Sequence, residues 1–232
     1  MMKKKAIYLL ILCFNYIHSQ TDISNILLGI EEKTDMSVTV FDSLVIKKDY
    51  ENLESVKNDT PENLMKSILS ANSQEWFDYN ILGGSLKSSK KKEEYFNKVK
   101  NMDKDKNFIK LIHSIDYSIN NIPTRILKFY FKQDKMKDVS GCYVLQKING
   151  RWYKTSNPTT SNLSIIIMRI KTNVLIELLT GETSNNKIKE IHKNINSNGF
   201  IDINLFEKIF FSWYSPTKNT EMLNLFIDSK AW

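Results

Sequence analysis

Two stretches in the middle of the chain alternate between apolar and polar residues. Every second residue from 109 to 119 is apolar, aromatic or histidine, and apolar residues alternate with lysine and tyrosine from 127 to 132. This period of two is typical of strands with one buried face. A further strand is expected over 139–148, and the Asn149-Gly150 pair after it predicts a type I′ turn, because both central residues of that turn need positive φ. A return strand over 151–155 completes an antiparallel meander.

Apolar residues recur at helical spacing on both sides of the meander. Thr60 and Pro61 predict a helix start, with a capping hydroxyl before a proline, and the helix is expected to reach Tyr79. A second helix, capped by Ser88 or Ser89, follows two glycines. After the meander, apolar residues from 163 to 178 predict a helix that ends at Gly181, which suits a left-handed cap. Two more helices are expected over 186–194 and 203–213.

The segment before these helices has its own period-two pattern. Met36, Val38, Val40, Leu44 and Ile46 lie on one side of it. This spacing predicts a strand or a bent strand pair.

The first residues have the order of a secretory signal. Lys3–Lys5 precede an apolar run over 6–14, and a more polar stretch leads to Ser19, after which we expect cleavage. The run is far shorter than the ~20 residues that span a bilayer. Cys13 offers an alternative as a lipoprotein cysteine, but it follows Leu12 where a lipobox has a small residue. We therefore expect export to the periplasm or the extracellular space.

Charge and cysteine content narrow the possible functions. The net charge is +7, and three leader lysines contribute to it, so +4 remains after cleavage. Lysines are interspersed with Asp and Glu, and arginine occurs only three times, which argues against nucleic-acid binding. Cys142 alone remains after cleavage, so a hydrophobic core must hold the domain without an intramolecular disulfide. The abundance of Asn, Lys and Ile is typical of an AT-rich bacterial genome.

The order of helices, meander and Asn-Gly turn resembles the NTF2-like superfamily. The Thr60–Tyr79 helix and the run KINGRWYK at 147–154 carry the resemblance, which covers roughly residues 60 to 157. It implies an α+β fold in which helices pack on a curved antiparallel sheet that forms a cone around a cavity. The expected organisation is a signal peptide (1–19), an N-terminal strand region (20–58), an NTF2-like domain (59–157) and a C-terminal helical extension (158–232).

His113 is the candidate for chemistry, because it interrupts an apolar strand face between Leu111 and Ile115. In an open cavity it could act as a general base. The alternative, which we favour, is a hydrogen-bonded core histidine, because Asp116 points to the other face and offers no partner. An aromatic set could instead line a pocket for a small apolar ligand, although core packing also explains it; its members are Trp76, Tyr79, Tyr130, Tyr143 and Trp152.

A loop near the C-terminus resembles an EF-hand calcium loop. Asn194, Asn196 and Asn198 occupy positions one, three and five, and Asp202 occupies position nine. Position twelve is Leu205 where an EF-hand has the bidentate Glu, so we expect no calcium binding stronger than millimolar. No phosphate loop or Cys/His cluster occurs, and no cofactor or metal is predicted. Cys142, in mid-strand, is interpreted as a small buried hydrophobe.

These observations favour an exported, non-enzymatic protein that binds a ligand or an envelope protein partner. An NTF2-like enzyme that uses His113 is the first alternative, and a degenerate calcium module is the second. An enzyme requires an open pocket and a second polar group at His113. A binding protein allows this histidine to be packed with both ring nitrogens satisfied.

Overall fold

The computed structural model describes residues 21–30, 32–83, 90–155, 161–197, 200–213 and 220–228, with side chains within 36–83, 92–155, 161–196, 201–212 and 220–228. The expected leader and the caps Ser88 and Ser89 lie outside these residues. No helix in the described ranges combines the length and apolar character that crossing a bilayer requires.

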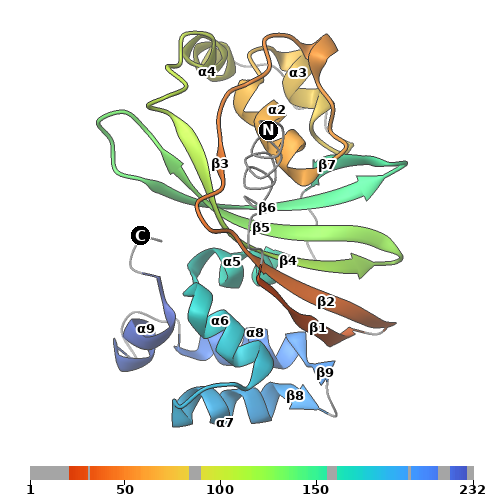
Figure 1. Ribbon diagram of the computed structural model, residues 1–232, viewed down its shortest axis with the longest axis vertical. Coiled ribbons are helices and arrows are strands. Elements are labelled where there is room, and N and C mark those ends of the chain that lie inside the picture. Colours follow the sequence, from red (N-terminus) through yellow and green to blue (C-terminus); the bar gives the residue numbers. More distant parts are fainter. Residues whose placement is uncertain are drawn as a thin grey trace, which may run out of the picture.

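One curved sheet runs through the middle of the molecule (Figure 1). Its strand order is β7-β6-β5-β4-β2-β1-β9-β8, with β3 beside β4. Neighbours are antiparallel except β1 and β9. The strands are β1 (Thr21–Ile30), β2 (Glu32–Val40), β3 (Val45–Ile46), β4 (Phe108–Ile119), β5 (Ile122–Lys132), β6 (Val139–Ile148), β7 (Arg151–Thr155), β8 (Asn196–Ser197) and β9 (Phe200–Ile201).

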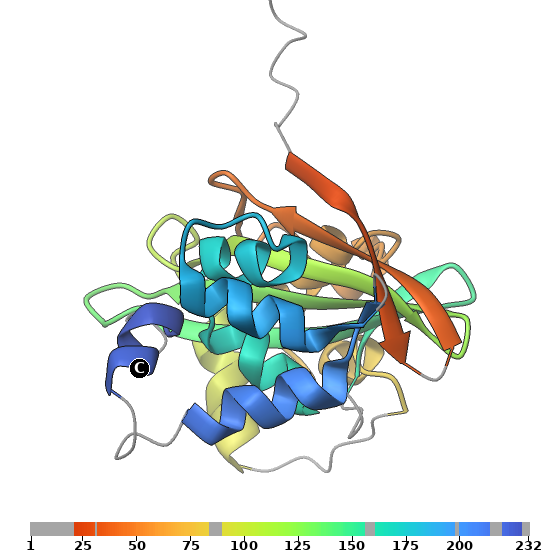
Figure 2. The same cartoon turned by 90° about the horizontal axis from the view of Figure 1, so that it is seen from below.

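Helices cover both faces of this sheet. One layer contains α2 (Pro61–Ser70), α3 (Gln74–Tyr79) and α4 (Lys90–Lys100), after the short helix η1 (Leu53–Ser55). The other contains α5 (Ser161–Arg169), α6 (Thr172–Thr180), α7 (Asn186–Ile195) and α8 (Ile203–Trp213), with α9 (Thr220–Phe226) beside them. Figure 2 shows this second layer in front of the strands. The α+β class, the curved antiparallel sheet and the C-terminal helices are therefore confirmed.

Each helical layer encloses its own hydrophobic core against the sheet. The first core joins Leu64 and Met65 of α2 to Leu127 and Leu145 of the strands. The second is larger and joins the apolar faces of α5 to α9 to strand residues such as Ile126. Burial of apolar surface on both sides of the central strands stabilises the whole arrangement.

A β-bulge in β4 changes the face on which its residues lie. Leu111 pairs with Phe129, whereas His113 pairs with Lys128, so the pairing shifts by one residue between them. Side chains alternate across a strand, and one extra residue therefore exchanges the two faces. Leu111 lies in the core under α2, while Ile115 lies in the core under the C-terminal helices. The expectation that His113 shares one apolar face with both residues is wrong for this reason.

Local sequence signals locate several boundaries. The Thr60 side chain accepts a hydrogen bond from the backbone N–H of Asn63 at the start of α2. Asn149 and Gly150 both have positive φ, as the predicted turn requires, and Gly181 has φ +76° at the end of α6. These three predictions are confirmed.

Two long predicted helices are each divided in the structure. The expected Thr60–Tyr79 helix ends at Ser70, and Ser73 caps the separate helix α3. The expected helix over 163–181 is interrupted between α5 and α6, where Ile170 pairs with Ile227 near the end of the chain. The prediction of two continuous helices is wrong because capping and tertiary pairing override helical periodicity.

Candidate functional site

His113 lies on β4 between the sheet and the C-terminal helices, and its side chain is fully buried. Its Nδ1 lies 2.9 Å from Thr172 Oγ1, and its Nε2 lies 3.2 Å from the backbone oxygen of Ile167. A carbonyl oxygen can only accept, so Nε2 carries the proton and Nδ1 accepts from the hydroxyl of Thr172. Both ring nitrogens are therefore hydrogen-bonded to the layer that covers them.

The surroundings of His113 keep the ring neutral. Burial, followed by the positive charge of Lys128, lowers the pKa of His113 to about 3. Hydrogen bonding to Ile167 and the charge of Asp228 act in the opposite direction and are weaker. At neutral pH the imidazole is therefore uncharged.

Lys128 is the charged member of this buried cluster. It pairs with His113 across β4 and β5, and its side chain is also fully buried. Its Nζ donates to the carboxylate of Asp228 at 2.9 Å and to the backbone oxygen of Ile170 at 2.8 Å. Burial lowers the pKa of Lys128, and the hydrogen bond to Asp228 partly offsets this effect. The Tyr130 hydroxyl donates to the same carboxylate oxygen.

This cluster fastens the end of the chain to the sheet. The backbone N–H of Asp228 donates to the oxygen of Arg169 at 2.8 Å, and the N–H of Lys171 donates to the oxygen of Phe226 at 3.0 Å. The break between α5 and α6 thus leaves backbone groups that pair with the end of α9 and with Asp228 after it. Lys128 contacts both sides of this junction, which indicates a role in fixing the C-terminal layer on the sheet.

Cys142 lies on β6 opposite Lys128. Burial is the main cause that raises the pKa of its thiol, to about 12, and the nearby Lys128 partly offsets it. A thiol with so high a pKa holds almost no thiolate at neutral pH, and the thiolate is the nucleophile. Cys142 packs against the core of the C-terminal helices, as expected for a small hydrophobe.

The aromatic candidates lie on two sides of the sheet. Trp76 is buried against α2 and donates from Nε1 to Ser67 Oγ at 2.9 Å. Trp152 belongs to the core under α2, and the Tyr143 ring packs at 4.8 Å from that of Phe129 in the same core. The Tyr130 hydroxyl donates a hydrogen bond to Asp228, on the side of the C-terminal helices. The structure therefore does not bring the five aromatic residues together around one cavity.

Tyr79 makes a different kind of contact at the end of α3. The guanidinium of Arg151 lies 3.3 Å from the centre of its ring, and an Arg151 nitrogen donates to the Tyr79 backbone oxygen at 2.5 Å. The Tyr153 ring lies 4.7 Å from the same guanidinium. Arg151 thus joins α3 to the edge strand β7 by cation–π stacking.

The residues of the calcium-like loop have other partners. Asp202 Oδ1 accepts from the backbone N–H of Leu205 at 2.9 Å and so caps the start of α8. Asn196 contacts the Nε2 atom of His192, and Asn194 is an exposed residue of α7. Asn198 lies outside the described residues. Among the side chains that are described, no group of three His, Cys, Asp or Glu is arranged to hold a metal.

Two surface cavities lie away from this cluster. One of about 360 Å³ is lined by residues after β3 and at the end of α4, including Lys48, Lys100 and Lys104. The other, of about 270 Å³, lies beside α6 and includes Glu177 and Asn185. His113 and the aromatic candidates line neither cavity.

The sequence interpretation did not identify Lys128, Thr172 or Asp228 as partners of His113. A lysine between Leu127 and Phe129 looks exposed when alternation alone is considered. Its position opposite His113 follows only once the bulge in β4 is known. Asp228 is a hundred residues further along the chain, and no local pattern connects it to the strand.

The fold and this buried cluster together define an α+β domain in which the histidine of β4 has a structural environment. Comparison with known proteins adds no family: no protein-family model, curated protein sequence or solved structure matches the chain.

Proposed function

We propose that this is an exported, non-enzymatic protein that binds a ligand or a protein partner through its surface. The observation that carries the proposal is the burial of His113 with both nitrogens hydrogen-bonded. A general base needs a pKa near the operating pH and contact with its substrate. The pKa of His113 lies well below neutral pH, its side chain is fully buried, and its partners Ile167 and Thr172 belong to the layer that covers it.

Export is the second part of the proposal. It is supported by the order of Lys3–Lys5, the apolar run and Ser19. After cleavage a single cysteine would remain, so no intramolecular disulfide could form. The hydrophobic cores on both faces of the sheet can stabilise the domain instead.

Replacement of His113 tests the non-catalytic role. We expect His113→Ala to lower the free energy of unfolding by about 1–3 kcal/mol, because it leaves a cavity and unpaired polar groups. Urea unfolding beside the unchanged protein measures this loss. A functional residue held at a cost to stability would give an unchanged or higher midpoint, and that result would contradict the proposal.

Thr172 offers a matched pair of variants for the same test. Thr172→Val removes the hydroxyl that donates to His113 Nδ1 but keeps the side-chain shape, so we expect a loss of about 1–3 kcal/mol. Thr172→Ser keeps the hydroxyl and should retain more of the stability. Equal stability of the two variants would show that the hydrogen bond to His113 contributes nothing.

A further inference from the structure

The end of the molecule formed by the β5–β6 loop and the α4–β4 loop has an apolar tip. Met136 and Val139 are 65 % and 51 % exposed, more than any other large hydrophobic side chain that the structure describes. Met136 lies in the connection from β5 to β6, which projects from the sheet on the left of Figure 1, and Val139 is the first residue of β6. Met136 at this loop tip is therefore available for contact with a partner.

The aspartates of these two loops are all engaged in ion pairs. Asp103 and Asp134 both contact Lys106, at 3.5 and 4.0 Å. Asp105 contacts Lys47 at 2.7 Å, and Asp138 pairs with Lys132. Each of these four aspartates thus has a lysine partner, and Lys106 is shared by two of them.

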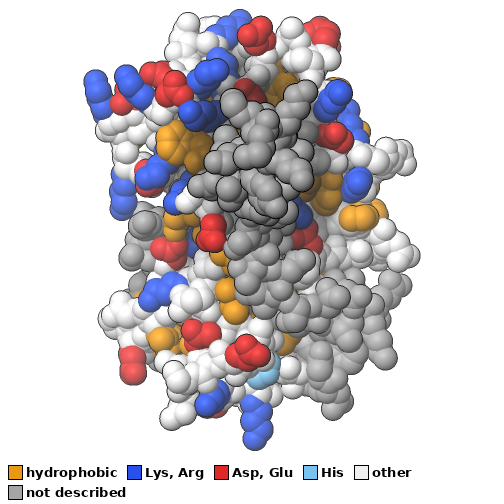
Figure 3. Space-filling view, viewed as in Figure 1, with side chains coloured by type: hydrophobic (Ala, Val, Ile, Leu, Met, Phe, Trp, Pro, Cys, Tyr) orange, Lys and Arg blue, Asp and Glu red, His pale blue; other side chains and the backbone are white. Residues whose placement is uncertain are grey.

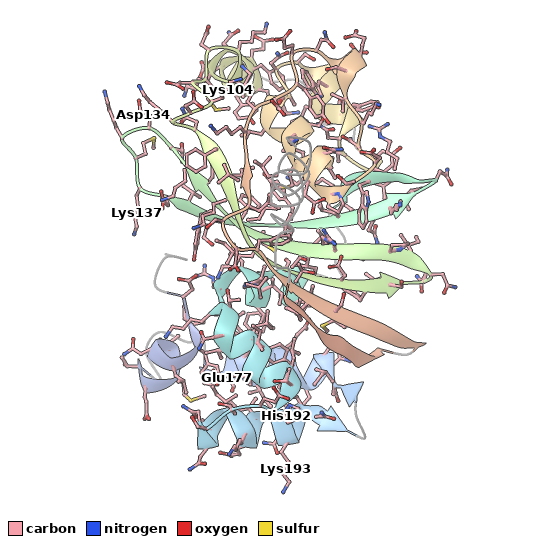
Figure 4. The ribbon with its side chains drawn as sticks, viewed as in Figure 1. Lys104, Asp134, Lys137, Glu177, His192 and Lys193 are labelled. Carbon is pink, nitrogen blue, oxygen red and sulfur yellow. The ribbon has the colours of Figure 1, made fainter. Side chains whose placement is uncertain are left out.

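Three exposed lysines of these two loops are not among the ion pairs. Lys135 and Lys137 flank Met136 directly, and Lys104 lies on the neighbouring loop (Figure 4). Within the described residues none of the three forms an ion pair. The face in Figure 3 shows basic side chains gathered along the same upper left edge, with acidic ones between them. The two lysines that flank Met136 thus carry positive charge outside these ion pairs.

The loop is held in the shape that displays Met136. The backbone N–H of Asp134 donates to Asn107 Oδ1 at 3.2 Å, which ties the β5–β6 loop to the start of β4. The N–H of Met136 donates to the oxygen of Gln133 at 3.3 Å, and the pair of Lys132 with Asp138 closes the base of the loop. Little ordering is therefore needed for Met136 to insert into a partner.

We propose that this end of the protein binds an anionic lipid surface, with Met136 entering the headgroup region between Lys135 and Lys137. The inference gives a partner to the binding role proposed above and rests on it. An apolar side chain between basic residues suits the interface of an anionic membrane. Lysine is depleted in protein–protein interfaces, so Lys135 and Lys137 beside Met136 favour a lipid surface over a protein partner.

Vesicle sedimentation of the chain from Gln20 to Trp232 tests this inference. We expect binding to vesicles of phosphatidylglycerol and phosphatidylcholine in equal parts, weaker binding at high salt, and little binding to phosphatidylcholine alone. Each basic residue near an anionic surface contributes about fivefold to binding. Lys135→Gln with Lys137→Gln should therefore weaken binding by a factor of about 25. Met136→Ser should weaken it while leaving the charge unchanged.

Lys189→Gln with Lys193→Gln is the matched control. Both lysines are exposed on α7, at the opposite end of the molecule (Figure 4), and the variant removes the same charge. It should bind like the unchanged protein, and all variants should melt at the same temperature. Equal weakening by the two double variants, equal binding to both vesicle types, or no binding at all would overturn the inference. So would a protein partner that binds through Met136 while vesicles do not.

The two proposals can fail separately in this assay. If His113→Ala abolished a catalytic activity while vesicle binding through Met136 persisted, only the non-enzymatic role would fall. If vesicle binding failed while His113 proved structural, only the lipid inference would fall.

Discussion

At the scale of single residues, the neutral ring of His113 makes stability depend on pH. The pKa of His113 is lowered to about 3 from 6.5, first by burial and then by Lys128. Between these values the unfolded chain binds a proton that the folded protein does not, so the contribution of His113 is complete above about pH 6.5 and is lost as the pH falls. Lys128 and Asp228 are ionisable groups that act on it, in opposite directions.

We expect the free energy of unfolding to drop between pH 7 and pH 4, with His113 contributing on the order of 2–4 kcal/mol. The measurement is urea unfolding across this range for the unchanged protein and for His113→Gln. The glutamine variant starts from a lower stability but should show a shallower decline. Parallel declines would mean that carboxylates elsewhere account for the whole dependence.

Gly141 is a second residue whose identity is fixed by a close contact. It pairs with Phe129 across β5 and β6, and a Cβ atom at Gly141 would lie 2.4 Å from Cζ of the Phe129 ring. The ring covers the glycine and packs on Tyr143. We expect Gly141→Ala to cost about 1–3 kcal/mol, because the ring must leave its packed position.

The Phe129→Leu background is the control for Gly141. Without the ring, the same Gly141→Ala change should cost less, and the coupling between the two positions can be read from the urea midpoints of the four proteins. An identical cost in both backgrounds would place the cause elsewhere in the strand.

At the scale of elements, α9 and the segment after it are held by the ion pair of Lys128 with Asp228. Lys128 is fully buried, so loss of its partner leaves an uncompensated charge. We expect Asp228→Asn to lower the free energy of unfolding by about 3–5 kcal/mol. The amide protons of Lys171 and Asp228, which join the two sides of the junction, should exchange faster with solvent.

Asp138→Asn supplies the comparison for Asp228. Its partner Lys132 has a side chain that is 37 % exposed, and pairs of this kind contribute at most about 1 kcal/mol. Similar small losses from both variants, with unchanged exchange at Lys171, would show that the buried pair does not hold the C-terminal segment.

The sequence predicts where strands and turns lie better than it predicts whether a helix is continuous. Alternation and the Asn149-Gly150 turn locate β6 and β7 to the residue, because these signals are local. The break between α5 and α6 has no local signal, since apolar spacing continues through it. It depends on pairing of Ile170 with Ile227, which the sequence does not reveal.

The candidate site illustrates the same limit. A buried, hydrogen-bonded His113 was the favoured interpretation, and its environment agrees with that interpretation. The expectation that His113 shares a strand face with Leu111 is wrong, because a β-bulge of one residue leaves no clear signal in the sequence. Its partners come from α5, α6, β5 and the end of the chain, so they could be found only when the layers were assembled.

At the scale of the whole molecule, the layers leave different surfaces for different roles. The central sheet is covered on both faces, so the strands β4 to β6 offer their residues mainly to the cores. Loops at the strand ends remain for contact with partners, as is common for binding surfaces on a rigid scaffold. The loop that carries Met136 is one of these. If the chain is exported as proposed, this loop would contact a lipid surface from the non-cytoplasmic side.

Export is tested by expression of the full chain in a host with the general secretory pathway. We expect the protein outside the cytoplasm with Gln20 or a close neighbour at its N-terminus, because Ser19 is the small residue at the expected cleavage point. N-terminal sequencing and fractionation measure this outcome. A variant with Lys3–Lys5 and two residues of the apolar run, Leu9 and Leu10, replaced by acidic residues should stay in the cytoplasm uncleaved. Exported protein that retains Met1 would contradict cleavage, and an acylated Cys13 at the N-terminus would establish the lipoprotein alternative instead.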